Sequence, residues 1–180
     1  MPIPRVHKKD ISAQRQVPSW LQVEIIERDG SWADLKSISK IIHNAVVALV
    51  EYPKIPKQTS CEVCIALSSD KDVADLNWKY RGKKSPTNVL SFPASAPSLV
   101  ERPLRTSKFL GDIIFARETI EREAQENNVN FSAHLAHLTV HGLLHLLGYD
   151  HDVESNARIM EDLETAILSK LGISDPYKTI

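Results

Sequence analysis

The chain of 180 residues has few cysteines, no long apolar run and almost no net charge, and each of these absences excludes something. Its apolar stretches are short and interrupted, so no transmembrane helix and no membrane partner are expected. The N-terminal segment lacks the apolar core of a secretory signal, which makes the cytoplasm the expected compartment. Because the net charge is only −1, any nucleic-acid binding has to depend on a local basic patch.

The two cysteines, Cys61 and Cys64, form a single C-x-x-C motif. Such a motif can act in redox chemistry or provide half of a zinc site. This one lies in a segment with the character of a strand, where residues three apart point to opposite faces. The chain contains no second C-x-x-C motif. The sequence therefore favours two packing cysteines over a metal or redox pair.

The composition, 42% apolar and 25% charged, is that of a soluble globular protein, and the length suits one domain. Residues 1–19 combine prolines and charges without periodicity, so we expect a poorly ordered tail before a single domain over 20–180. Residues 94–108 contain two prolines and four charges, and this long connection is a candidate functional edge.

Apolar periodicity predicts an alternation of strands and helices. Strands are expected at 21–27, 62–69, 87–93 and 109–116, and helices at 35–49, 70–80, 117–128, 131–147 and 156–172. This order predicts an α+β fold, in which a small mixed four-stranded sheet packs against about five helices. The side chains expected to face inward from the last helix are Ile159, Leu163, Ile167 and Leu171.

The most unusual segment is H-G-L-L-H-L-L-G-Y-D-H, which has three histidines within eleven residues. On a helix, His141 and His145 lie on one face, with about 6 Å of axial rise between their Cα atoms. Gly148 permits the turn that ends the helix and would return His151 to the same point. Three neutral imidazoles and one open position are the ligand set of a catalytic zinc site. Nickel, cobalt or copper could bind the same ligands.

The spacing H-x-x-x-H-x-x-G-x-x-H is that of the metzincin protease zinc helix, except at one position. Those enzymes have a glutamate after the first histidine as general base, and this chain has Gly142. The pattern therefore predicts the metal geometry without the proteolytic base. His134 and His137 precede the motif, and we expect core or interface roles for them. A role of His137 behind the metal ligands is the alternative.

The segment from His141 to His151 resembles the signature of the YbeY family of bacterial endoribonucleases. Residues 76–93, L-N-W-K-Y-R-G-K-K-S-P-T-N-V-L-S-F-P, resemble the family's second motif, and residues 110–116 resemble the strand that follows it. The likeness extends over roughly residues 21–177, which is nearly all of the part expected to be globular.

This resemblance implies a small sheet packed with helices and one Zn²⁺ ion held by His141, His145 and His151. It implies cleavage of single-stranded RNA in the maturation of the 16S ribosomal RNA 3′ end, and quality control of the small subunit within the 70S ribosome. Arg81 corresponds to the family's functional arginine and is the expected catalytic residue. The implied partners are the 16S precursor and the small ribosomal subunit, with ribosomal proteins or an assembly GTPase as further candidates.

Elementary chemistry supports RNA cleavage in part. Zinc can activate water and polarise a phosphoryl oxygen, and the planar guanidinium of Arg81 can pair with phosphate. The segment W-K-Y-R-G-K-K around it mixes four basic residues with two aromatic ones, and Arg102, Arg105 and Lys108 add positive charge further along. With glycine at 142, the attacking group is either activated water or the 2′-hydroxyl of the RNA. Asp150 could assist or, more simply, orient a histidine.

Two other functions stay open at this point. One is a non-catalytic ribosome assembly factor that zinc merely stabilises, because fold and metal do not prove turnover. Retained subunit binding with lost cleavage in Arg81→Ala would argue against it. The other is a metallopeptidase, which the histidine spacing favours and Gly142 disfavours. Hydrolysis of a generic peptide, abolished by His145→Ala, would support it.

Overall fold

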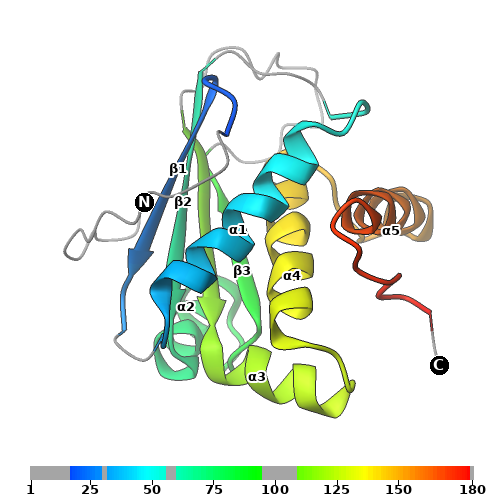
Figure 1. Ribbon diagram of the computed structural model, residues 1–180. Helices are drawn as coiled ribbons and strands as arrows, with labels where there is room; N and C mark the ends of the chain where they lie inside the picture. The colour runs from blue at the N-terminus through cyan, green and yellow to red at the C-terminus, as the bar shows by residue number, and fades with distance from the viewer. Residues whose placement is uncertain (1–16, 30–31, 56–59, 95–108, 179–180) are drawn as a thin grey trace.

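A computed structural model describes residues 17–29, 32–55, 60–94 and 109–178 (Figure 1). The strands are β1 (Leu21–Glu27), β2 (Cys61–Ser68), β3 (Val89–Pro93) and β4 (Phe109–Ala116). The helices are α1 (Leu35–Val50), α2 (Asp70–Arg81), α3 (Arg117–Glu126), α4 (Phe131–Leu146) and α5 (Glu154–Ser169). Every predicted element is present, and the α+β class is confirmed. The expectations for residues 1–16 and for the connection at 95–108 lie outside the described residues.

The strands form one mixed sheet in the order β1-β2-β4-β3. β1 and β4 each pair with β2 in parallel, and β3 pairs with β4 in the antiparallel direction. β2 is buried along nearly its whole length, which explains its continuous apolar sequence. β3 is an edge strand of five residues that packs against α4. The helix with the histidines therefore lies near one edge of the sheet.

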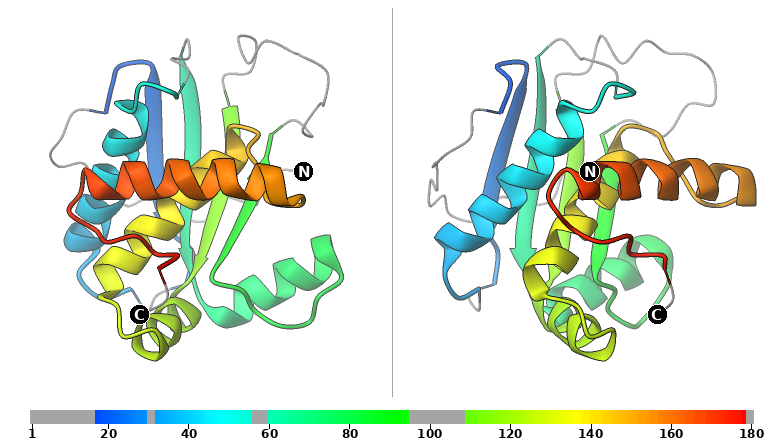
Figure 2. Two further views of the ribbon diagram at one scale, coloured as in Figure 1. Left: turned by 90° about the vertical axis from the view of Figure 1, so that its right-hand side faces the viewer. Right: turned by 45° about the vertical axis from the view of Figure 1, so that its right-hand side comes forward.

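Helices cover both faces of the sheet (Figures 1 and 2). α1 and α4 pack together over one face, and α5 lies outside α4 on the same side. α2 covers the opposite face with Val73 and Leu76, which belong to a smaller apolar cluster. Cys61 belongs to the larger cluster and Cys64 to the smaller one, so the two thiols lie on opposite faces, as expected.

α4 is the central helix of the molecule. It contacts α1, α3 and α5 as well as β3 and β4, which explains why its sequence is apolar on nearly all sides. Its start is capped by Asn130, whose side chain accepts a hydrogen bond from the Ser132 amide at 2.8 Å. Among the described helices, none combines the length and the apolar character needed to cross a membrane.

The buried side of α5 agrees with the prediction at Leu163 and Ile167 and differs from it at Ile159. Met160, Leu163 and Ile167 are buried, whereas Ile159 is 54% exposed. The prediction placed residues four apart in one row, and such a row drifts around a helix of 3.6 residues per turn. The buried side of α5 also includes Glu164, a charged residue with 0% exposure. The buried position of Glu164 places a carboxylate next to the histidines of α4.

Candidate metal centre

The three histidines of the motif converge at the C-terminal end of α4. His141 and His145 lie one turn apart, with 3.0 Å between their Nε2 atoms. The ring centroid of His151 lies 5.5 Å from that of His141 and 5.0 Å from that of His145. One potential ligand atom of each residue lies within 4.8 Å of the other two. The expected convergence of these side chains is therefore present in the structure.

A tight turn after α4 returns His151 to the other two histidines. Gly148 has a φ of 92°, in the left-handed region that glycine adopts without steric cost. The Tyr149 amide donates to the Leu144 carbonyl oxygen at 3.0 Å, a bond that spans the end of the helix. The glycine predicted to end the helix thus also directs the third histidine.

Asp150 holds this turn in place. Its carboxylate accepts hydrogen bonds from the Asn156 side chain at 2.9 Å and from the Asp152 amide at 3.3 Å. These two bonds, together with His145 and His151 nearby, keep the pKa of Asp150 below its usual value. Its hydrogen bonds to described residues attach the turn to the start of α5, so the expected role in orienting a histidine is not what the structure presents.

Hydrogen bonds to His141 and His145 decide which ring nitrogens are available to a ligand. Nδ1 of His141 lies 2.8 Å from Glu164 Oε1, and Nδ1 of His145 lies 3.0 Å from the Tyr149 carbonyl oxygen. Carboxylate and carbonyl oxygens only accept, so we assign each Nδ1 as the donor and place the lone pair of each neutral ring on Nε2. Two lone pairs that face each other at 3.0 Å repel unless a cation or a proton lies between them. The arrangement therefore suits a metal ion.

His145 is held in the form that binds metals. Its burial, together with the neighbouring His141 and His151, lowers the pKa of His145 to about 4. Its ring is therefore neutral at neutral pH, and only a neutral imidazole has a lone pair for a metal.

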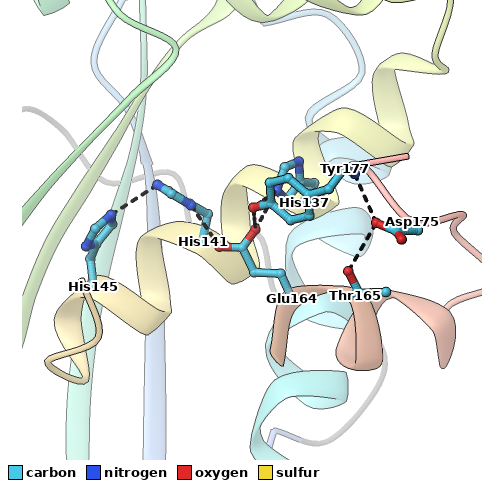
Figure 3. A network of polar contacts seen from close by, with 7 residues as sticks. All are labelled: His137, His141, His145, Glu164, Thr165, Asp175 and Tyr177. Carbon is cyan, nitrogen blue, oxygen red and sulfur yellow. Dashed lines mark hydrogen bonds and ion pairs between the residues drawn. The ribbon is translucent and has the colours of Figure 1, made fainter. Parts of the chain in front are cut away.

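A buried glutamate of α5 lies behind the histidines (Figure 3). Glu164 accepts hydrogen bonds from His141 Nδ1 at 2.8 Å, from His137 Nε2 at 2.6 Å and from the Tyr177 hydroxyl. Burial by itself raises the pKa of Glu164, but the hydrogen bonds from His137 and His141 outweigh it and lower the pKa to about 2. Our sequence reasoning missed this residue. The available signal was a glutamate within the apolar stripe of the last helix.

The two histidines before the motif have different partners. His137 donates to Glu164 and so lies in the layer behind His141, as the alternative interpretation stated. His134 Nε2 lies 2.8 Å from Glu123 Oε2, which joins α4 to α3. His134 therefore joins two helices, whereas His137 has the role that was given as the alternative.

Gly142 allows α4 to pack directly on the sheet. A Cβ atom at this position would lie 3.1 Å from two methyl carbons of Ile113 and 3.2 Å from Ser91 Oγ. The Ser91 hydroxyl also donates to the Gly142 carbonyl oxygen at 3.3 Å. A side chain at 142 would therefore point into β3 and β4, which gives a packing reason for the glycine where metzincins have their general base.

Arg81 lies on a different element, at the end of α2. It is exposed, and Gly82, with a φ of 68°, ends the helix immediately after it. The preceding Tyr80 packs edge-on against Phe92 of β3, with 5.2 Å between ring centroids. Phe92 follows Ser91, whose hydroxyl contacts α4. The edge strand β3 thus connects the end of α2 with the histidine helix.

The segment around Arg81 exposes aromatic and basic side chains together. Trp78 is 54% exposed, and the Lys84 ammonium lies 4.9 Å from the centroid of its ring. Such a combination can stack on bases and contact phosphates. The other basic residues considered from the sequence, Arg102, Arg105 and Lys108, lie outside the described residues.

Fold and site together define the class: an α+β protein with a metal-type cluster of three histidines on its central helix. The family model described as "Endoribonuclease YbeY" matches residues 24–172. The chain belongs to this family of YbeY endoribonucleases, as the sequence resemblance implied.

Curated relatives support the same assignment, and each is named "Endoribonuclease YbeY". A protein of Rhizobium etli is 53% identical over 127 residues, which are 71% of this chain and 70% of the relative. A protein of Parvibaculum lavamentivorans is 44% identical over 174 residues, which are 94% of this chain and 92% of the relative. A solution structure of a Thermotoga maritima protein matches 88% of this chain and 100% of its own, with a TM-score of 0.51 and 21% identity. At that identity, the last match supports the fold alone.

Proposed function

We propose that the protein is a metal-dependent endoribonuclease whose single zinc ion is held by His141, His145 and His151. The observation that best supports this proposal is the pair of Nε2 atoms of His141 and His145 that face each other at 3.0 Å, beside a third imidazole. Relatives named as endoribonucleases, which align with nearly the whole chain, support RNA as the substrate. The proposed function accounts for both the histidine cluster and the names of the relatives.

The donor set fits zinc well. Three neutral imidazoles suit its preference for nitrogen ligands and leave one coordination position open, as in catalytic zinc sites. When bound, such an ion polarises a phosphoryl oxygen and lowers the pKa of a coordinated water molecule. The lowered pKa of His145 favours metal binding at neutral pH.

The residues of the chain provide the other catalytic functions. Arg81, at the exposed end of α2, binds a phosphate group through its guanidinium and stabilises the charge that develops there. Gly142 has no side chain to act as a base. Glu164 accepts three hydrogen bonds and has a pKa of about 2, so it is a poor proton acceptor as well. The nucleophile is therefore activated without a protease-type glutamate.

For the substrate we propose single-stranded ribosomal RNA, in particular the 3′ end of the 16S precursor within the small ribosomal subunit, in the cytoplasm. The exposed Trp78 and the basic residues around it offer stacking and phosphate contacts to a single strand. Ribosomal proteins or an assembly GTPase would be secondary partners in this process, and quality control of 70S ribosomes would use the same cleavage.

Cleavage of a synthetic 16S precursor fragment tests this function. We expect the native protein to cut, and His145→Ala and Arg81→Ala to lose at least about 100-fold in rate, because each removes a ligand or a charge-stabilising group. His145→Ala, purified identically, is the control for contaminating nucleases, and His43→Ala, whose ring bonds Ser39 within α1, should cut like the native protein. Equal cutting by the native protein and His145→Ala, or cutting by neither, would favour the non-catalytic assembly factor instead.

The metallopeptidase alternative has less support in the structure. Its general base would occupy position 142, where even a Cβ atom would lie 3.1 to 3.2 Å from Ile113 and Ser91 of the sheet. We therefore expect no hydrolysis of a generic peptide substrate under conditions in which the RNA fragment is cut.

A further inference from the structure

The burial of Glu164 carries a large free-energy cost. It is 0% exposed, and an ionised carboxylate without partners in such a place would cost several kcal/mol. Both of its oxygens accept hydrogen bonds: Oε1 accepts from His141, while Oε2 accepts from His137 and from the Tyr177 hydroxyl. Three donors from two separate segments, α4 and the C-terminal segment, converge on this one carboxylate. Their number compensates for the cost of burying its charge.

The hydrogen bond from His141 to Glu164 controls the ring that faces His145. The Nδ1 proton of His141 has this carboxylate as its acceptor at 2.8 Å, and the Nε2 atom on the opposite side of the ring is thereby left with its lone pair. Without an acceptor at Nδ1, the proton could sit on either nitrogen and the ring could turn. A carboxylate behind a metal-binding histidine generally fixes both properties.

Tyr177 reaches this carboxylate from the C-terminal segment beyond α5 (Figure 3). Its ring packs edge-on against that of His137, with 5.7 Å between centroids. Its amide donates to Asp175 Oδ1 at 2.9 Å, and the Thr165 hydroxyl donates to the same oxygen at 3.2 Å. Thr165 is the residue next to Glu164. The C-terminal segment is therefore attached to α5 at the point where its tyrosine meets the glutamate.

Glu164, His137 and His141 could also be considered a second set of metal ligands. The distances argue against this. Ligand atoms about 2.0 Å from a tetrahedral ion lie roughly 3.3 Å from one another. Here the nitrogen and oxygen atoms are 2.6 and 2.8 Å apart, and each pair joins an N–H donor to a carboxylate acceptor, as in a direct hydrogen bond. The two Nε2 atoms of His141 and His145, in contrast, are both assigned as acceptors. The carboxylate is thus a partner of the histidines rather than a ligand.

We propose that Glu164 and Tyr177 are positioning residues of the metal centre: Tyr177 and His137 hold the carboxylate, and the carboxylate fixes His141 with its Nε2 atom toward the metal. The C-terminal segment is then a component of the site, and metal binding is coupled to its docking. This inference rests on the proposed function, because it assumes that the three histidines bind zinc.

The test is zinc affinity, measured by competition with a chromophoric chelator, for the purified native protein and variants. Glu164→Gln should weaken zinc binding about 10- to 100-fold, because the amide can donate to Nδ1 and shift the His141 proton to Nε2. Tyr177→Phe should weaken it less, by about 3- to 10-fold, because the carboxylate remains. In the Glu164→Gln background, Tyr177→Phe should have no further effect. Glu154→Gln, on the exposed start of α5, and Tyr52→Phe are the matched controls and should bind zinc normally.

A second readout separates positioning from plain structural support. Long-range proton–nitrogen NMR spectra of the metal-free protein report which nitrogen of His141 is protonated, and we expect Nδ1 in the native protein and Nε2 in Glu164→Gln. Native zinc affinity in Glu164→Gln, or an additive effect of Tyr177→Phe in the double variant, would overturn the proposal. Failure of the proposed function looks different: zinc affinity would then be no weaker in His145→Ala than in the native protein.

Discussion

At the scale of single residues, Gly142 has the clearest physical explanation. The backbone of α4 approaches β3 and β4 so closely that a Cβ atom would lie within 3.1 to 3.2 Å of Ile113 and Ser91. Ile113 is fully buried. Helix packing thus explains the residue that most distinguishes this motif from the protease motif.

Introducing the protease glutamate with Gly142→Glu should therefore destabilise the folded protein rather than create a peptidase. We expect the free energy of unfolding to fall by about 3 kcal/mol or more, because the side chain overpacks the core and buries a charge. Denaturant titration measures this change. Ser132→Glu, on the exposed first turn of the same helix, should be nearly neutral. A Gly142→Glu protein with native stability would refute the packing explanation.

A second residue-scale prediction concerns Asp72. Arg28 donates to both of its oxygens, at 2.7 and 3.0 Å, and Ser68 donates at 2.5 Å. Burial raises the pKa of Asp72, but these hydrogen bonds outweigh it and hold the pKa below 3.8. Because the pKa is lowered on folding, the carboxylate stabilises the protein above the unfolded pKa of about 3.9. This contribution is lost as pH falls through the folded pKa.

Asp72→Asn should therefore lower the free energy of unfolding by about 1–3 kcal/mol at pH 7. The difference from the native protein should shrink as pH decreases below about 4. Urea titrations at a series of pH values measure both quantities. The exposed Asp162→Asn serves as control and should change little at any pH. A stability difference that is independent of pH would contradict this account of the ion pair.

At the scale of elements, α4 depends on its first turn as well as on its packing. Asn130 caps the helix through the Ser132 amide, and the proposed metal ligands lie at the other end. Asn130→Ala should cost about 1 kcal/mol of stability, because it leaves a helix amide without a partner. Zinc affinity should stay unchanged, since the three histidines are several helical turns from Asn130. Thermal unfolding and chelator competition together measure this, with the exposed Gln125→Ala as control. A large loss of zinc affinity would mean that the cap and the site are coupled.

α5 combines a packing role with a chemical one. The side that buries Met160 and Leu163 also holds Glu164 against α4. Because one surface of the helix does both, a substitution that rotates or tilts α5 would disturb the core and the histidines together. This dependence explains why the C-terminal segment, which attaches to α5, belongs to the metal centre in our proposal.

At the scale of the whole molecule, zinc should stabilise the folded protein by mass action. At a free zinc concentration about 100 times the dissociation constant, the gain is about 2.7 kcal/mol, or roughly 5–10 °C in melting temperature for a domain of this size. Removal of the metal with a chelator should reverse it. Differential scanning calorimetry of the metal-free and zinc-loaded protein measures the shift.

His151→Ala should abolish most of this shift, although His151 is exposed and contributes little to packing. His43→Ala is the control, because its ring bonds the Ser39 carbonyl oxygen within α1. It should keep the full zinc response. An equal zinc response in the two variants would show that the ion binds somewhere other than the predicted cluster.

Local patterns in the sequence were sufficient for the elements and for the three histidines. Strands and helices follow from apolar periodicity, and the three clustered histidines lie within one helix and one turn, where spacing alone places the side chains. The prediction failed where it depended on the rotation of a helix. Ile159 was expected inside and is exposed, because repeated steps of four residues drift around α5.

The sequence by itself determined the order of elements, the fold class and the convergence of His141, His145 and His151, because each of these depends on neighbours along the chain. Only the tertiary structure decided what stands behind the histidines. Glu164 is 23 residues from His141, and Tyr177 is 40 residues from His137. Such contacts depend on how α5 and the C-terminal segment dock against α4. Docking is set by packing over the whole core, which no local pattern specifies.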